Sequence, residues 1–400
     1  MSRSFRNILF AILLLGVARL SGVEASLVAS KAVNVHDMFS GLLPNRIPAI
    51  PELKTVRPGE RFNIYILLSK LQTRKGKAHV TGSLYLIKGD SKTEIFKDQE
   101  LFYGDCPAPT EINLSNTVAN WDFPDSFESG RYQITVEVKD VVNGNTATAS
   151  SSVELVKTPP EPLKITTNEI RGFISSFYKA PQPERLLELF NIFLAGDKAA
   201  RKQKNYSPLP LLYGMARVLE YHPQIWKDFA RRSHELDGDH KKYLALLFAA
   251  VNNDAIDFMI KNCDRKTAGY FEKMKQNNPW HFEEPYSSED INSFWMEFYF
   301  TGKPQPLLKI ANQLKNRPIM TGKQAKEKKG ELNPADKLKL RNYYSASSAS
   351  WSIATNAGQH NLVFFYLEEM LVNGKFADAT AAAKIQKILF RAAANASENQ

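Results

Sequence analysis

Cysteine is almost absent from this chain of 400 residues, which carries only Cys106 and Cys263. The two lie on opposite sides of a proline-rich segment, so a bridge between them would have to span that segment. We therefore expect two separate thiols. A small scaffold held together by several disulfides is excluded.

Long apolar runs and cofactor motifs are also missing. After the first 20 residues, no segment approaches the 18 apolar residues that cross a bilayer. The sequence has no phosphate-binding glycine loop, dinucleotide fingerprint, zincin motif or paired-cysteine metal site. We accordingly expect no cofactor, no metal ion and no transmembrane segment once the N-terminus is removed.

The composition is that of a globular protein, with 43% hydrophobic and 24% charged residues, enough for two cores. The formal net charge is +10. Such a charge favours anionic partners such as nucleic acid, acidic lipid or acidic glycan. Solubility alone is the alternative explanation of the charge.

Residues 1–25 have the three parts of a secretory signal peptide. Arg3 and Arg6 precede an apolar run over residues 8–18, and Val23-Glu-Ala25 places small residues where signal peptidase cuts. The sequence therefore predicts an exported protein that begins at Ser26, in the periplasm or at the cell surface. An uncleaved N-terminal anchor is the alternative.

The segment Lys157-Thr-Pro-Pro-Glu-Pro-Leu-Lys164 divides the chain. Its three prolines cannot continue a strand ladder or enter a helix interior, and they favour an extended spacer. Sequence before it has the period of strands and sequence after it the period of helices. We predict an irregular segment over 26–50, a β domain over 51–157, a linker over 158–168 and an all-α domain over 169–400.

Short alternating segments with turn residues between them predict an antiparallel β-sandwich in the first domain. The expected strands are 61–68, 80–87, 94–103, 111–118, 129–140 and 146–156.

The clearest strand is Ser129-Gly-Arg-Tyr-Gln-Ile-Thr-Val-Glu-Val-Lys-Asp140, which places Tyr132 on the apolar face, and Asn143-Gly144 then predicts a tight turn. This hairpin resembles the last one of immunoglobulin-like and fibronectin-like sandwiches, in which a tyrosine packs as a corner. The resemblance covers about residues 55–157 and implies a fold without implying a function.

A helical period fills the second domain. Helices are expected from Ile170, from Pro183, and over 211–221, 223–236, 239–251, 254–262, 264–277, 288–300, 304–316, 333–355, 361–372 and 377–394. Residues 170–191 recur as 291–312 with eight identities in 22 ungapped positions, where ordinary usage gives about one or two. The fold class predicted is thus α+β multidomain, with an internal duplication of a helical-repeat kind. Two unrelated helix hairpins with similar core needs are the alternative.

Two stretches of the helical domain combine residue types that bind ligands. His234-Glu-Leu-Asp-Gly-Asp-His240 matches no zinc or calcium spacing, and Asp237-Gly238 and Asp239 read better as a helix stop and a helix cap. Trp280, His281, Glu283 and Glu284 join the two repeat units and are candidates to contact a ligand in a cleft. A loop tucked between the repeat units explains the same residues.

Two further stretches give weaker signals. Lys323, Lys326, Lys328 and Lys329 form a basic run that suits anionic lipid or glycan, or a solvated loop. Because no aromatic residues are interleaved with it, no nucleic-acid partner is expected. Residues 350–360 carry serine, threonine and histidine without the turn that presents a nucleophile, so no catalytic residue is assigned there.

These observations favour an exported, non-catalytic binding or scaffolding protein of the cell envelope. Its expected partner is another envelope or extracellular protein. The alternative function is a secreted or periplasmic hydrolase with its cleft in the helical domain near His281. An enzyme predicts a deep pocket with convergent polar groups and shifted pKa values, and an interaction protein predicts a broad exposed face.

Overall fold

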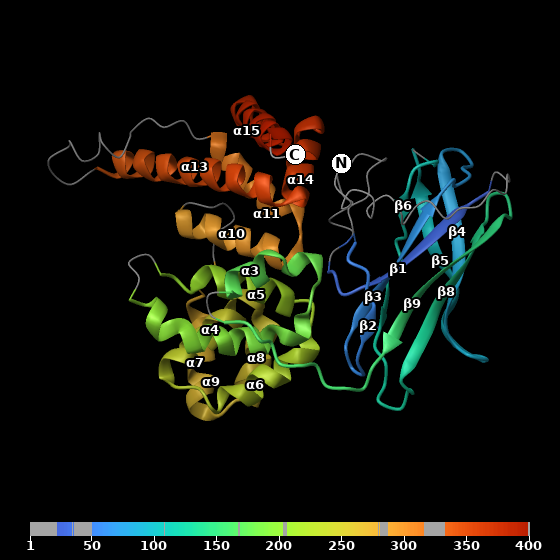
Figure 1. Ribbon diagram of the computed structural model, residues 1–400, viewed down its shortest axis with the longest axis horizontal. Coiled ribbons are helices and arrows are strands. Elements are labelled where there is room, and N and C mark those ends of the chain that lie inside the picture. Colours follow the sequence, from blue (N-terminus) through green and yellow to red (C-terminus); the bar gives the residue numbers. More distant parts are fainter. Residues whose placement is uncertain are drawn as a thin grey trace.

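The computed structural model of the protein describes residues 22–33, 35, 50–107, 109–166, 169–202, 206–278, 280, 287–315 and 333–398. The part before the linker consists of strands and is here called the sheet half. The part after the linker consists of helices and is called the helical half. The two lie side by side, and residues 156–166, which form no helix or strand, run between them (Figure 1). Strands followed by helices are what the sequence predicts.

Two sheets form the sheet half. The first has the order β1-β3-β6, with β7 also paired to β3, and the second has the order β2-β9-β8-β4-β5. All pairings are antiparallel except the short parallel one between β2 and β9. The strands are β1 Glu24–Ser30, β2 Thr55–Val56, β3 Phe62–Ser69, β4 Lys77–Lys88, β5 Ser91–Asp105, β6 Asn113–Leu114, β7 Ala119–Trp121, β8 Gly130–Asp140 and β9 Thr146–Leu155.

One hydrophobic core is shared by the inner faces of both sheets. Ile64 and Ile66 of β3 lie in the same buried cluster as Ile134 and Val136 of β8. Tyr132 is buried as expected, and its hydroxyl donates to the carbonyl oxygen of Glu128 at 2.8 Å. Packing between the sheets, rather than the propensity of any one strand, therefore stabilises this half.

The expectation of an irregular segment from residue 26 is wrong for its first part. Residues 24–30 form β1, which pairs with β3 from Glu24 opposite Ser69 to Ser30 opposite Asn63. Val23, just before the strand, is buried as well. The sequence of β1 holds mostly alanine and serine, which favour strands weakly, so pairing with a distant strand decides its conformation.

Within the described residues, the helical half contains twelve α-helices. Their ranges agree with those expected from the sequence to within a few residues at each end, except that α3 is short. They are α3 Ile170–Ser175, α4 Leu186–Ala200, α5 Leu209–Leu219, α6 Trp226–Ser233, α7 Gly238–Val251, α8 Asn253–Asn262, α9 Arg265–Gln276, α10 Ser288–Thr301, α11 Pro304–Asn312, α13 Pro334–Gln359, α14 Asn361–Val372 and α15 Ala379–Glu398. None of these helices combines the length and the apolar character that a membrane span requires.

Two hydrophobic clusters fill the helical half. One is built mainly from α4 to α9, and the other from α10 to α15. Figure 1 shows the same division, with the green and yellow helices below and the orange and red helices above. The ring of Tyr213, which packs against the first cluster, contacts that of Phe294 in the second, with centroids 6.2 Å apart, so aromatic packing joins the two clusters.

Close contact between α5 and α10 depends on Gly214. A Cβ atom at this position would lie 2.5 Å from Cδ2 of Phe300 and 2.8 Å from Cβ of Met296. Atoms of a packed core cannot approach so closely, so one helix would have to move. The absence of a side chain at Gly214 thus sets the spacing at the junction of the two helical clusters.

We predict that Gly214→Ala lowers the free energy of unfolding by about 1–3 kcal/mol, the range for overpacking a core. Gly269→Ala in α9 is the matched control, because its new Cβ would meet no atom within 4 Å. In an exposed helix interior that change should be neutral or stabilise by up to about 1 kcal/mol. Denaturant unfolding of both variants measures this, and equal effects would contradict the account of the α5–α10 contact.

Candidate functional site

Trp280 lies at a pocket of about 350 Å³ on the helical half. Tyr213, Arg217, residues 249–253 and Asn278 line the same pocket. The indole Nε1 donates to the carbonyl oxygen of Leu246 at 2.9 Å, and the indole packs against the ring of Tyr213 with centroids 5.5 Å apart. The predicted ligand candidates His281, Glu283 and Glu284 lie outside the described residues.

Glu297 of α10 adds a titratable group to this region that the sequence analysis missed. Burial raises the pKa of Glu297, while the nearby charges of Arg217 and Lys303 act in the opposite direction. Its carboxyl is hydrogen-bonded to Tyr213, and burial, followed by the charge of Glu297, raises the pKa of the tyrosine. The arrangement can hold a proton on a carboxyl group, and no sequence motif surrounds Glu297 that would have revealed it.

The His234–His240 stretch serves mainly to begin a helix and to link neighbouring helices. Asp237, rather than the expected Asp239, is the N-cap of α7, since its carboxylate accepts from the amide of His240 at 2.9 Å. His240 also pairs with Asp237 at 3.4 Å, whereas His234 pairs with Asp264 at 3.6 Å. Within the residues that the structure describes, no group of three or more metal-ligating side chains converges.

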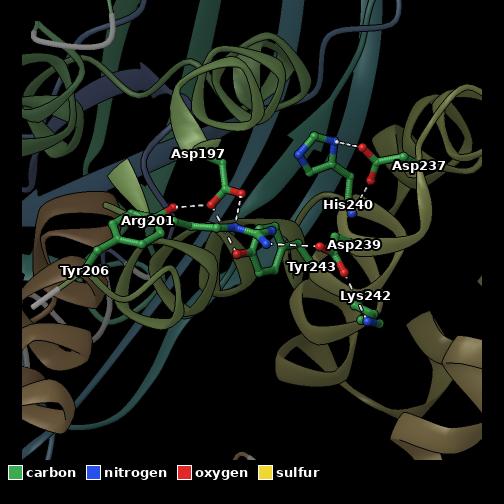
Figure 2. Close-up of polar contacts among 8 residues, drawn as sticks. All are labelled: Asp197, Arg201, Tyr206, Asp237, Asp239, His240, Lys242 and Tyr243. Atoms are coloured by element: carbon green, nitrogen blue, oxygen red, sulfur yellow. Dashed lines mark hydrogen bonds and ion pairs between the residues drawn. The ribbon is translucent and has the colours of Figure 1, made fainter. Parts of the chain in front are cut away.

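A buried carboxylate, Asp197 of α4, organises the polar cluster next to that stretch (Figure 2). Only 2% of Asp197 is exposed. Tyr206 and Tyr243 donate to its Oδ1 at 2.7 and 3.1 Å, and Arg201 donates through Nε to Oδ2 at 2.5 Å. Arg201 also reaches Asp239 at 3.0 Å. Both carboxylate oxygens are satisfied by donors from three separate parts of the chain, which indicates a structural cluster.

The remaining sequence candidates do not form a catalytic arrangement. Residues 350–359 belong to α13, and His360, which follows it, has Nδ1 3.3 Å from the hydroxyl of Tyr178. The described hydrogen bond of the His360 ring is thus with a buried tyrosine and not with a serine. Lys323, Lys326, Lys328 and Lys329 lie outside the described residues.

One face of α13 leaves large side chains in solvent. Tyr344 is 49% exposed and Trp351 70%. Exposed residues recur along the helix with spacings of three and four, at positions 344, 347, 351, 354 and 358, and at about 100° per residue these positions lie within roughly 80° of one another. These five positions therefore form one continuous stripe, called here the α13 stripe.

A buried lysine joins the sheet half to the helical half. Lys31 follows β1 and is 7% exposed. Its Nζ lies 2.8 Å from Oε2 of Glu60 in the sheet half and 2.8 Å from Oε1 of Glu184 in the helical half. Burial opposes ionisation of Glu60, but Lys31 and Arg57 outweigh burial, and the pKa of Glu60 is lowered. The three side chains thus form an ion-pair network that spans the boundary.

The linker and one further contact reinforce that boundary. Arg57 donates through Nε to the carbonyl oxygen of Thr158 at 2.9 Å, and the amide of Leu163 donates to Glu188 at 2.9 Å. Leu362 of α14 packs against the small cluster that contains Tyr65 of β3. Hydrogen bonds and apolar packing therefore add to the ion pairs at the boundary.

Comparisons with known proteins leave the chain unassigned. No protein-family model and no curated protein matches it. One solved structure that it is similar to is the CARDB domain of a Pyrococcus furiosus protein in complex with di-metal ions, with 11% identity and a TM-score of 0.20 over 35% of this chain and all of that domain. Another is a family 123 glycoside hydrolase from Clostridium perfringens, with 14% identity and a TM-score of 0.21 over 45% of this chain and 36% of the enzyme. At these scores neither likeness supports a function.

We predict that Asp197→Asn lowers the free energy of unfolding by about 2–4 kcal/mol, because Arg201 loses its buried counter-charge and the two tyrosines compete for one amide oxygen. Chemical denaturation measures the effect. The control is Asp228→Asn, whose ion pair with Arg231 is exposed and spans 3.7 Å, so the expected cost is below about 0.5 kcal/mol. A cost at Asp197 as small as that at Asp228 would contradict the structural role of the cluster.

Proposed function

We propose that this protein is an exported, non-catalytic binding or scaffolding protein of the cell envelope, and that its partner is another protein. The observation that carries the proposal is the α13 stripe, with Trp351 exposed at its middle. Tryptophan has a large apolar surface, so leaving it in water costs more free energy than leaving any other exposed side chain of this helix there. Aromatic residues are also enriched at the centres of protein interfaces.

Charge around the stripe suits an acidic partner. Lys337 and Arg341 precede Tyr344 by seven and three residues, at the N-terminal end of the stripe, and the chain as a whole carries +10. Charged groups at the rim of an interface speed association and select the partner, while the buried aromatic residues provide most of the affinity. An acidic surface with an apolar pocket for one indole ring is the complement that the stripe requires.

Export is proposed from the signal-like residues 1–25, and the structure bears on where the leader ends. A cut after Ala25 would remove Val23, which is buried, and Glu24 and Ala25, which pair with Ser69 and Leu68. We therefore place the mature N-terminus at or before Val23 rather than at Ser26. Intact-mass analysis of the exported chain distinguishes these ends.

Two finer points of fold belong to the same proposal. The antiparallel strands, the shared core and the buried Tyr132 support an immunoglobulin-like sandwich. The duplication is supported by equivalent roles of Asn191 and Asn312. Asn191 accepts a hydrogen bond from Arg232 at 2.9 Å, and Asn312 accepts one from the amide of Ala377 at 2.9 Å, so each fastens its own hairpin to a later segment.

A hydrolase with its cleft near Trp280 is the second candidate. The observation that favours it is the carboxyl of Glu297, whose pKa is raised by partial burial and which is hydrogen-bonded to Tyr213 at the wall of the 350 Å³ pocket. A carboxyl group with a raised pKa can act as a general acid. Loss of a hydrolytic activity in Glu297→Gln, with partner binding unchanged, would favour this function over the first.

The test of the first proposal is capture of envelope proteins on the immobilised full chain. We expect a discrete acidic protein to be retained by the wild type, and its affinity to fall at least tenfold in Trp351→Ala, since a central interface tryptophan commonly contributes about 2 kcal/mol or more. Tyr103→Ala is the matched control, because Tyr103 is an exposed aromatic residue of the sheet half.

Equal retention by wild type, Trp351→Ala and Tyr103→Ala would contradict a role for the α13 stripe. Both variants replace exposed side chains, so their unfolding midpoints should match that of the wild type. This match separates a binding defect from a folding defect.

A further inference from the structure

A second, smaller pocket lies between the two halves, close to the buried Lys31. Its volume is about 100 Å³. The sheet half contributes Lys31, Arg61, Asn63 and Asn120 to its walls, and the helical half contributes Tyr221 and His222. We call it the boundary pocket.

His222 is the feature of the boundary pocket that calls for a ligand. The residue is only 4% exposed, and its Nε2 has no hydrogen-bonding partner among the residues that the structure describes. Gln224 lies with its Nε2 3.2 Å from Nδ1 of the histidine. With the amide in this orientation Nδ1 accepts, so the neutral ring carries its proton on Nε2. A buried N–H donor without an acceptor is costly, and an acceptor placed in the pocket would remove that cost.

The charges around His222 determine whether the ligand is an anion or a cation. Lys31 and Arg61 are the two charged residues that line the pocket, and both are cationic. Burial, then Lys31, then Arg61 lower the pKa of His222 to about 4, so the ring is neutral near pH 7. Glu60 and Glu184 face Lys31 from the two halves, and no carboxylate belongs to the pocket wall. A metal cation would meet one histidine and two positive charges, so an anion is the fitting ligand.

Further donors surround the same space. The ammonium group of Lys31 has three N–H donors, and the two carboxylates account for two of them. The hydroxyl of Tyr221 accepts from Lys303 at 3.0 Å, which leaves its own proton to donate. Within the described part of the chain, the guanidinium of Arg61 makes no ion pair. An anion here would receive charge-assisted bonds, which are the strong ones.

The volume limits the size of the ligand. About 100 Å³ corresponds to roughly three water molecules at the density of the liquid, which suits one phosphate, sulfate or carboxylate group. Lys31 also lines the adjoining 460 Å³ pocket, so a larger molecule would have to carry its anionic group inward past this residue.

We propose that the boundary pocket binds a single oxyanion, held by Nε2 of His222 and Tyr221 from the helical half and by Lys31 and Arg61 from the sheet half. The ligand would therefore contact both halves at once. By linkage, its binding stabilises their mutual arrangement. This site is independent of the α13 stripe, and either proposal can fail without the other.

Calorimetric titration of the full chain with inorganic phosphate and, separately, with acetate tests the proposal at pH 7 and fixed ionic strength. Saturable binding of phosphate, of acetate or of both is the expected result, and the preferred ion identifies a tetrahedral or a carboxylate ligand. Heats no larger than those of sodium chloride at equal ionic strength for both ions would overturn it.

Variants locate the site. Arg61→Gln should weaken binding at least tenfold, and Arg131→Gln, at an exposed arginine of the same half, should leave it unchanged. Because Arg61 is also exposed, both variants should fold. If Arg61→Gln and Arg131→Gln change the affinity for the anion equally, the assignment of the site to the boundary pocket is wrong. In NMR titration of the wild type, the bound anion should raise the pKa of His222 as it favours the imidazolium, and a pKa that does not move would also count against the site.

Discussion

The buried ammonium group of Lys31 is the constraint on which the arrangement of the two halves depends. A lysine removed from water requires carboxylate partners at close range, and the sheet half supplies one of them while the helical half supplies the other. Removing one partner from a buried ion pair commonly costs about 3–5 kcal/mol, because a charge is left unpaired. Separation of the halves would expose Lys31 to water but also break its pair with Glu184. The short path of the linker, fastened at Thr158 and Leu163, keeps these groups in register.

Packing plays the corresponding role inside the helical half. Gly214 brings α5 and α10 into direct contact, and the rings of Tyr213 and Phe294 continue that contact between the two clusters. The pocket beside Trp280 and the carboxyl of Glu297 lie along the same junction. The candidate sites of this protein are thus found where its packing units meet, which is where concave surfaces commonly form. Its exposed stripe, by contrast, lies on the solvent side of α13, whose opposite face is covered by neighbouring helices.

Local pattern was sufficient to predict most elements of this chain. Alternation around Ile134 and Val136 identifies β8, and Asn143-Gly144 gives the turn that follows, where Gly144 has a φ of 79°. Helical spacing and capping residues such as Asn333 mark the helices. The strand β1 escaped prediction because its alanines and serines adopt the conformation that β3 imposes by pairing.

The polar sites were harder to predict because their members are distant in sequence. Asp197 meets Tyr243, 46 residues later, and Lys31 meets Glu184, 153 residues later. A lysine, a glutamate or a tyrosine considered alone carries no sign that it will be buried. Only Trp280, among the predicted ligand contacts, falls in the described part of the chain and lines a pocket there. His222 gave no signal either, since neither metal-ligand spacing nor a catalytic motif surrounds it.

The most direct test of this account is a double-mutant cycle between Lys31 and Glu184 in the full chain. Unfolding free energies of Lys31→Met, Glu184→Gln and the double variant isolate the interaction across the boundary, because the bond of Lys31 to Glu60 cancels in the cycle. If the lysine holds the two halves together, the coupling energy should be about 1 kcal/mol or more. Single effects that add to within about 0.5 kcal/mol would contradict the claim.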